Sequence, residues 1–207
     1  MHDCCRAFVA FVMLCLAFAF LAAGGPSPAG ASPAAVRPPQ KKSDLTYADR
    51  KAWYRILRWP QEYEDDFDAV LGVDKDKGWM KFFELAPKKY LVEVQCNLFA
   101  YQAGFIYLFY DESVSPPTAR LLTFKSFYRD NKQVKTQEEA LVAGLPEFSP
   151  RTGELSVWTK GRGLGDCGAW AVYRIEGGRA VLQEFRAKDD CDGKYVDPKQ
   201  YPRLYPR

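Results

Sequence analysis

Histidine is almost absent from this chain of 207 residues, because the single one, His2, is the second residue. Three reaction classes depend on this side chain: the Ser-His-Asp hydrolases, the Cys-His proteases and the enzymes with a histidine-ligated catalytic zinc. His2 lies in a segment that has the pattern of a removable export signal. We therefore expect none of these three chemistries in the processed protein.

The chain also lacks a large excess of charge of either sign. The chain has 29 Lys and Arg residues against 26 Asp and Glu residues, which gives a net charge of +3. Proteins that bind nucleic acid carry a strongly basic surface, and a charge this close to balance does not supply one. We expect no nucleic-acid partner.

The N-terminal segment has the three parts of a secretory signal peptide. A short polar start is followed by an unbroken apolar run over residues 7–23, and residues 29–31 read Ala-Gly-Ala, a cleavage pattern. Residues 22–23 are a second cleavage candidate. We predict a signal peptide at residues 1–31 and a periplasmic or secreted protein. An uncleaved segment, with about 17 apolar residues, would instead approach the length of a membrane anchor, and only then would the protein contact a membrane.

The rest of the chain divides into a linker and one domain. Residues 32–43 are rich in Pro and Ala and have no apolar periodicity, which is typical of a linker. Residues 44–207 are enough for a single globular domain with its own core.

Helical patterns open this domain. Thr46 followed by Asp49 resembles a capping box, Pro60 ends the first helix and starts a second, and Gly72 ends the second. Acidic residues crowd the second helix, and we expect them either beside the positive helix N-terminus or on a solvated face. They are Glu62, Glu64, Asp65, Asp66 and Asp68.

From Trp79 onward the apolar period changes from that of a helix to that of a strand. Paired glycines at residues 176–179 indicate a hairpin, whereas Thr136 and Glu139 indicate a capped short helix over residues 136–143. The predicted strands are residues 90–98, 104–110, 119–128, 154–160, 169–175 and 181–186. The sequence therefore predicts an α+β fold: N-terminal helices packed on an antiparallel, hairpin-connected sheet of about six strands, with one disulfide.

Three of the six cysteines remain after signal removal, namely Cys96, Cys167 and Cys191. One pair is expected to form in an oxidising compartment. The predicted hairpin between Cys167 and Cys191 favours their pairing, which would close a loop of about 24 residues and stabilise the fold by roughly 3 kcal/mol. The alternative pairs Cys96 with Cys167 across adjacent strands. In the favoured arrangement Cys96 is a buried thiol without the histidine that would activate a nucleophile.

Residues 160–168, KGRGLGDCG, carry the densest motif of the domain. The alternating glycines resemble a phosphate-binding loop, but no Walker Lys-Ser/Thr pair follows and the segment runs into a strand rather than a helix. We interpret the motif as a tight loop and expect no cofactor. It is the candidate for contact with a ligand or partner, through Lys160, Arg162, Leu164 and Asp166.

A Cys167–Cys191 bridge would also bring acidic side chains together. Asp166 would approach Asp190 and Asp192, and carboxylate oxygens are the ligands that Ca²⁺ prefers. The acidic stretch is only a fragment of a calcium loop, because no Glu stands at the closing position. We expect no bound metal, with these three residues as the candidate Ca²⁺ ligands if there is one.

These motifs, in this order, resemble a known family. The segment TGELSVWTKGRGLGDCG at residues 152–168, a hairpin, Cys191-Asp192-Gly193 and a closing YPRLYP resemble the secreted bacterial family called domain of unknown function 1176. Residues 91–104, LVEVQCNLFAYQAG, are similar to the same family, and the resemblance covers residues 53–206. It implies an exported protein of the Gram-negative envelope, and it brings no activity and no catalytic residues.

Two functions fit these observations. The first is a non-catalytic binding or interaction domain, in one form inhibitor-like, whose bridged loop contacts an envelope protein or a cell-wall ligand. The alternative is a carboxylate-dependent hydrolase of cell-envelope glycans, because two carboxyl groups suffice for that reaction. Asp166, with an acid from residues 189–192, is the pair that the bridge would bring together.

Overall fold

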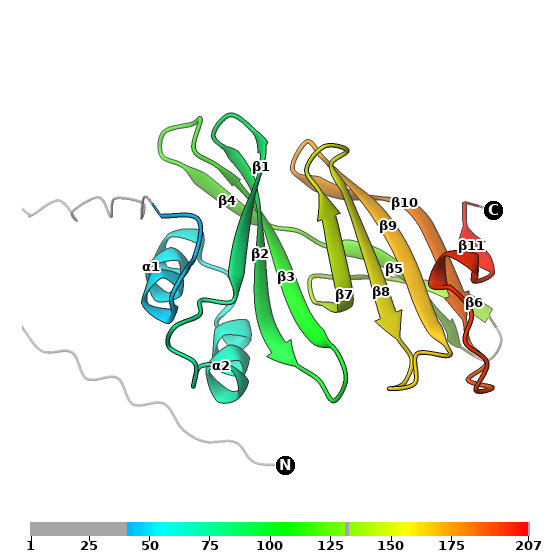
Figure 1. Cartoon of the computed structure of the whole chain (residues 1–207). Coiled ribbons are helices and arrows are strands. Elements are labelled where there is room, and N and C mark those ends of the chain that lie inside the picture. The colour runs from blue at the N-terminus through cyan, green and yellow to red at the C-terminus, as the bar shows by residue number, and fades with distance from the viewer. Residues whose placement is uncertain (1–40, 131–132, 207) are drawn as a thin grey trace, which may run out of the picture. The chain divides into compact units, whose positions relative to one another are not determined.

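The computed structural model describes residues 41–130 and 133–206, so the predicted signal peptide and most of the predicted linker lie outside the described residues. Figure 1 shows a mostly β arrangement in the described chain. The helices are α1 (Tyr47–Leu57), α2 (Gln61–Val70) and the short 3-10 helix η1 (Pro198–Gln200). The strands are β1 (Met80–Ala86), β2 (Lys89–Leu98), β3 (Ala103–Asp111), β4 (Thr118–Leu121), β5 (Phe124–Asp130), β6 (Gln133–Glu139), β7 (Val142–Ser149), β8 (Glu154–Lys160), β9 (Gly168–Glu176), β10 (Arg179–Lys188) and β11 (Arg203–Tyr205).

Nine of the strands form one antiparallel sheet in the order β1-β2-β3-β7-β8-β9-β10-β11, with β4 paired to β3. The sheet has two parts, which meet where β3 pairs with β7 through only three residue pairs. We call this junction the seam; its pairs are Ala103 with Gly144, Gly104 with Ala143 and Phe105 with Val142. The remaining two strands, β5 and β6, pair only with each other.

The predicted α+β fold is wrong, because the sheet is much larger than six strands and the helices are few and short. The helix expected at residues 136–143 is replaced by β6 and the start of β7. The strand expected at residues 119–128 is split, so that β4 pairs with β3 while β5 pairs with β6. Strands β1, β7 and β11, which were not predicted, complete the sheet.

The two helices begin and end near the predicted positions. Thr46 accepts a hydrogen bond from the backbone of Asp49, and the Asp49 carboxylate accepts one from the backbone of Thr46, so the capping box is present. Pro60 separates α1 from α2 and is the residue before the second helix. Figure 1 shows both helices on the side of the β1–β3 part of the sheet that faces away from β7–β10.

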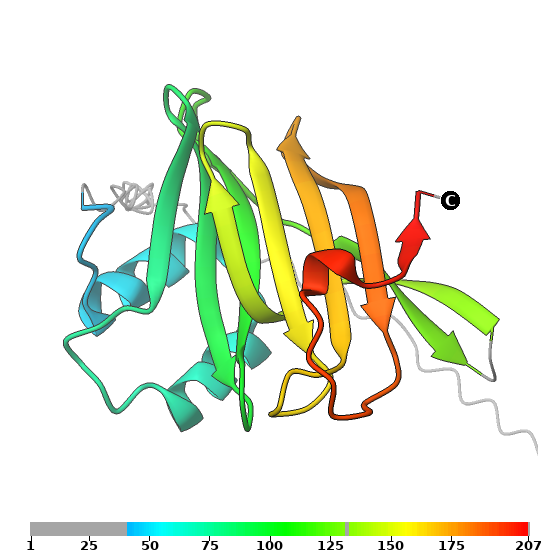
Figure 2. The same cartoon turned by 45° about the vertical axis from the view of Figure 1, so that its right-hand side comes forward.

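The large sheet carries a hydrophobic cluster on each face, as period-two alternation requires. Along β2, Leu91 belongs to one cluster, whereas Val92, Val94 and Cys96 belong to the other. The cluster with Cys96 is covered by the helices through residues such as Trp53. The opposite cluster is covered by the β5–β6 hairpin, which Figure 2 shows beside β10.

A buried ion pair joins the helices to the sheet. Arg50 and Glu64 are both buried, and the Arg50 Nη2 lies 2.8 Å from the Glu64 Oε2. Arg50 Nη1 also donates to the carbonyl oxygens of Gly78 and Gln95, at 3.2 and 2.9 Å. The expectation that the acids of α2 lie beside its N-terminus or on a solvated face is therefore incomplete, because Glu64 in its first turn faces the core.

Within residues 41–130 and 133–206, no helix has both the length and the apolar character needed to cross a bilayer. The apolar run at residues 7–23 lies outside the described residues.

Candidate functional site

The KGRGLGDCG motif forms the connection between β8 and β9. Lys160 ends β8 and pairs with Gly168, which begins β9, so the loop between them closes a hairpin. Two of its glycines are required by the backbone: Gly165 has a φ of +69°, and a Cβ at Gly168 (φ +145°) would lie 2.1 Å from the carbonyl oxygen of Thr159. The interpretation as a tight loop, rather than a phosphate cradle, agrees with this geometry because a strand follows.

A disulfide fixes the end of this loop. Cys167 is bonded to Cys191, which lies 24 positions further along the chain in the segment after β10. The expected pairing is therefore present. Cys96 is free and buried on β2, and burial raises the pKa of its thiol to about 12. At that pKa the thiol stays protonated near neutral pH, which is the wrong state for a nucleophile.

Arg162 and Asp166, both in this loop, form an ion pair with each other. Arg162 Nε donates to Asp166 Oδ1 at 2.8 Å and its Nη2 donates to Oδ2 at 2.6 Å, a two-point contact. The same Nη2 donates to the carbonyl oxygen of Cys191, and the backbone N–H of Gly193 donates to Asp166 Oδ2 at 2.6 Å. These hydrogen bonds, that of Arg162 foremost, hold the pKa of the Asp166 carboxyl well below its usual range.

Lys188, which the sequence analysis did not single out, joins the loop to the segment after β10. Its Nζ donates to the carbonyl oxygens of Asp166 and Asp190, at 2.6 and 2.7 Å, and to Asp192 Oδ1 at 2.7 Å. The hydrogen bond from Lys188 lowers the pKa of Asp192. Asp189 forms a separate ion pair with Arg129 on β5. In the sequence, the only feature that could have pointed to Lys188 is the group of acidic residues that follows it.

The carboxylates of two of the three candidate calcium ligands are engaged by cations. Asp166 is only 2% exposed and is bound by Arg162, while Asp192 is bound by Lys188. Asp190 offers its carbonyl oxygen to Lys188. In the part of the chain that the structure describes, no three Asp, Glu, His or Cys side chains gather closely enough to hold a metal ion.

The four candidate contact residues of the loop have different surroundings. Lys160 places its Nζ over the ring of Trp158, 5.1 Å from the centroid, while Arg162 and Asp166 pair with each other. Leu164 at the apex is 74% exposed. Of these four side chains, that of Leu164 is therefore the one presented to solvent as an unpaired apolar group.

A second loop at this end of the sheet, the turn between β2 and β3, also carries exposed apolar side chains. This turn contacts the β8–β9 loop directly, because Tyr101 Oη donates to the carbonyl oxygen of Gly161 at 3.0 Å. Figure 1 shows both loops at the same end of the sheet. Leu98, Phe99 and Tyr101 are all exposed there, and sequence reasoning missed them. We call Leu98, Phe99, Tyr101 and Leu164 the apolar tip.

The fold and the site thus define the class of this protein. It is a small, mostly β domain with one structural disulfide, and no catalytic cluster is identified among its described residues. The chain belongs to the family described as "Protein of unknown function (DUF1176)", whose sequence model matches residues 21–207. The family expected from the sequence motifs is therefore confirmed.

The chain is also similar, over a short stretch, to a curated protein. The chain is 38% identical over 58 residues to the "Uncharacterized protein YpfG" of Escherichia coli strain K12. This match covers 28% of the chain and only 16% of the E. coli protein. No solved structure matches the chain. The comparisons thus establish a family of unknown function and supply no activity.

Proposed function

We propose that this protein is a non-catalytic binding domain of the bacterial envelope that uses the apolar tip to contact a protein partner. The observation that carries the proposal is the exposure of Leu164, 74%, at the apex of a loop that is otherwise held in place. An apolar side chain in that position has no role in the packing of the domain itself, whereas exposed apolar clusters often mark interaction sites.

The restraints on the loop favour binding. The Cys167–Cys191 bond, the Arg162–Asp166 pair and the Lys188 hydrogen bonds fix the loop before any partner arrives. A preorganised loop loses little conformational entropy on association, so more of the contact energy contributes to affinity. Protein inhibitors of enzymes use the same principle, and an inhibitor-like role is the specific form of this proposal.

The composition of the tip fits a protein rather than a polar ligand. Leu98, Phe99 and Leu164 offer apolar surface, and Tyr101 is of a type enriched at binding hot spots. Arg162, whose side chain remains 43% exposed, supplies a polar rim beside Leu164. An apolar centre with a charged rim is the usual arrangement of a protein interface.

The glycan hydrolase has no comparable support. A general acid in that reaction needs a carboxyl whose pKa is raised, whereas the pKa of Asp166 is lowered by Arg162. The pKa of Asp192 is lowered as well. Both carboxyl groups are anions held by cations, which stabilises the loop instead of preparing a proton transfer.

Site-specific photo-cross-linking in cells tests the proposed function. A photoreactive amino acid replaces Leu164 in one variant and Val114 in a control; Val114 is 45% exposed beyond the other end of β3, roughly 30 Å away. We expect a single major cross-linked protein from position 164 and none from position 114. A Leu164→Asp variant should lose that protein in affinity capture while keeping its thermal midpoint.

Two outcomes would contradict the proposal. Equal cross-linking from positions 114 and 164 would show non-specific proximity, and no adduct from position 164 would show that the tip is free in the cell. A cross-linked homodimer would also contradict it, because the partner would then be a second copy of this chain.

A further inference from the structure

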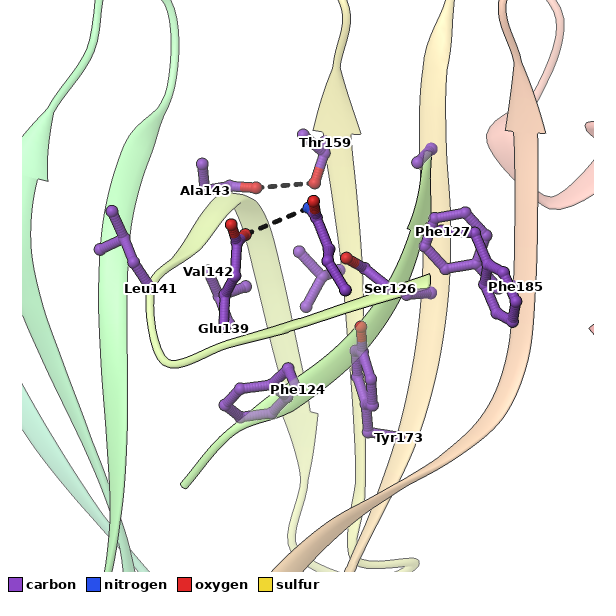
Figure 3. Close-up of a pocket in the computed structure, with 14 residues that line it drawn as sticks. Phe124, Ser126, Phe127, Glu139, Leu141, Val142, Ala143, Thr159, Tyr173 and Phe185 are labelled. Atoms are coloured by element: carbon purple, nitrogen blue, oxygen red, sulfur yellow. Dashed lines mark hydrogen bonds between the residues drawn. The ribbon is translucent and has the colours of Figure 1, made fainter. Parts of the chain in front are cut away.

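A cavity of about 290 Å³ lies between the β5–β6 hairpin and the face of the large sheet formed by β7 to β10. Figure 3 shows Phe124 and Tyr173 at one end of this cavity and Glu139 with Thr159 at the other. Its volume is near the lower limit of about 300 Å³ that is usual for small-molecule sites. None of its lining residues belongs to the apolar tip, so the cavity is independent of the proposed function.

The cavity follows from the sizes of the side chains on the two surfaces. Aromatic pairs hold the hairpin away from the sheet: Phe124 packs on Tyr173 with centroids 5.0 Å apart, and Phe127 packs on Phe185 at 5.3 Å. Between these contacts the sheet presents small residues, Ala143, Ala169 and Ala171. Large side chains at the edges of the cavity and small side chains between them leave a space that a small molecule can occupy.

The lining of the cavity is mainly apolar, with polar groups supplied by Ser126, Gln137, Glu139, Thr159 and the Tyr173 hydroxyl. Glu139 is the single charged residue among those that line it. Its Oε2 accepts a hydrogen bond from Gln137 Nε2 at 3.2 Å, and no Lys or Arg within residues 41–130 and 133–206 forms an ion pair with it. Thr159 uses its hydroxyl to donate to the Ala143 carbonyl oxygen at 2.7 Å. An uncompensated carboxylate at the end of an apolar cavity attracts a cation.

We propose that this cavity binds a small amphipathic cation, with its apolar body between the hairpin and the sheet and its ammonium group at Glu139. The aromatic and alanine walls select a compact alkyl or aryl group by removing it from water. The Glu139 carboxylate attracts a ligand with a positive head group and repels a ligand of similar size whose head group is a carboxylate. A fatty acid or other organic anion is therefore the wrong ligand for this site.

Three probes that differ only in the head group test the proposal: phenethylamine, phenethyl alcohol and phenylpropanoate. Each is titrated at neutral pH into the isotope-labelled protein and followed by amide NMR shifts. We expect phenethylamine to bind most tightly, to shift the signals of residues on β5, β6, β8 and β9, and to leave Leu164 unaffected. Phenylpropanoate should not bind measurably.

Substitutions in the cavity distinguish the contribution of the Glu139 charge to binding from that of the cavity's shape. Glu139→Gln should weaken phenethylamine binding about fivefold, the effect of a partly exposed ion pair, and leave phenethyl alcohol unchanged. Glu138→Gln is the matched control, because Glu138 is the adjacent acid on β6, does not line the cavity, and should change nothing. Ala171→Leu should fill the space and abolish binding of both the amine and the alcohol.

The proposal is overturned if phenylpropanoate binds as well as the amine, if Glu139→Gln has no effect, or if none of the probes shifts the signals of the hairpin. Glu139 is exposed on a strand paired only with β5, so its substitution leaves the core intact and remains informative even if Ala171→Leu fails to fold.

Discussion

At the scale of single residues, the buried pair of Arg50 and Glu64 is the strongest constraint on the helical part of the domain. Besides their contact with each other, Glu64 accepts hydrogen bonds from Trp59 Nε1 at 3.1 Å and Lys51 Nζ at 2.8 Å. The Arg50 guanidinium lies 3.4 Å from the ring centroid of Phe67. Each charge is fully paired, so removal of one leaves the other buried and uncompensated.

Glu64→Ala is therefore expected to lower the free energy of unfolding by about 3–5 kcal/mol. Glu62→Ala, at an exposed position of the same helix, is the control and should change it by less than about 0.5 kcal/mol. Urea unfolding followed by circular dichroism measures both. A loss below about 1 kcal/mol for Glu64→Ala would mean that the unpaired Arg50 is readily hydrated. Joint replacement of Arg50 and Glu64 by Met and Leu should cost less than the single change.

At the scale of elements, the β8–β9 loop depends on its bridge to the segment after β10. The Cys167→Ser/Cys191→Ser variant should lose about 3 kcal/mol of stability, because the unfolded chain regains the entropy of a loop that the bond closes. Urea unfolding gives this value, and reduction of the parent protein by dithiothreitol should reproduce it. A midpoint that stays unchanged, or a peptide map that places Cys96 in the bridge, would contradict this expectation.

Strands β6 and β7 show where sequence patterns failed. β6 reads QVKTQEE, and it pairs only with β5, so little of it is buried and its alternation has few apolar residues. Glu and Gln favour helices, and Thr136 with Glu139 resembles a cap, which produced the wrong prediction. In β7, Pro146 interrupted the strand pattern although it lies opposite Val157 of β8.

Other elements were predictable because the residues that determine each of them are close together in the sequence. Thr46 and Asp49 satisfy each other's backbone groups, and Gly177 with Gly178 supplies the positive φ angles of the β9–β10 hairpin. The disulfide followed from that hairpin. The apolar tip was only partly predictable. Leu164 lies within the motif, whereas Tyr101 lies 60 positions before Gly161, the residue it contacts, and the two come together only in the folded sheet.

At the scale of the whole molecule, the ionisable groups divide into two sets that act at opposite ends of the pH range. Hydrogen bonds to the charged form lower the pKa values of five aspartates, namely Asp49, Asp68, Asp111, Asp166 and Asp192. Burial raises the pKa values of Cys96 and of five tyrosines, namely Tyr63, Tyr107, Tyr110, Tyr173 and Tyr201. The one histidine of the sequence, His2, lies in the predicted signal.

Stability should therefore be nearly constant from about pH 5 to about pH 8 and should fall on both sides, at the alkaline side first through Cys96, whose unfolded pKa is about 8.5. The aspartates stabilise the fold above their unfolded pKa of about 3.9, and this contribution is lost as the pH falls toward their lower folded values. The tyrosines stabilise it below their unfolded pKa of about 10, and this contribution is lost as the pH rises toward their higher folded values. Urea midpoints across the range measure the profile, and a step near pH 6.5 would contradict it.

The seam between β3 and β7 has a consequence for the order in which the domain assembles. Strands β1 to β4 and β7 to β10 are each joined by short antiparallel connections, so each part can form from contacts that are near in sequence. Ala103 and Gly144 of the seam are about 40 positions apart, and such distant pairings form slowly. The apolar tip takes Tyr101 from the first part and Leu164 from the second, so it exists only once the seam is closed. A partner that binds both loops would therefore stabilise the contact between the two parts of the sheet, and its presence would slow their separation.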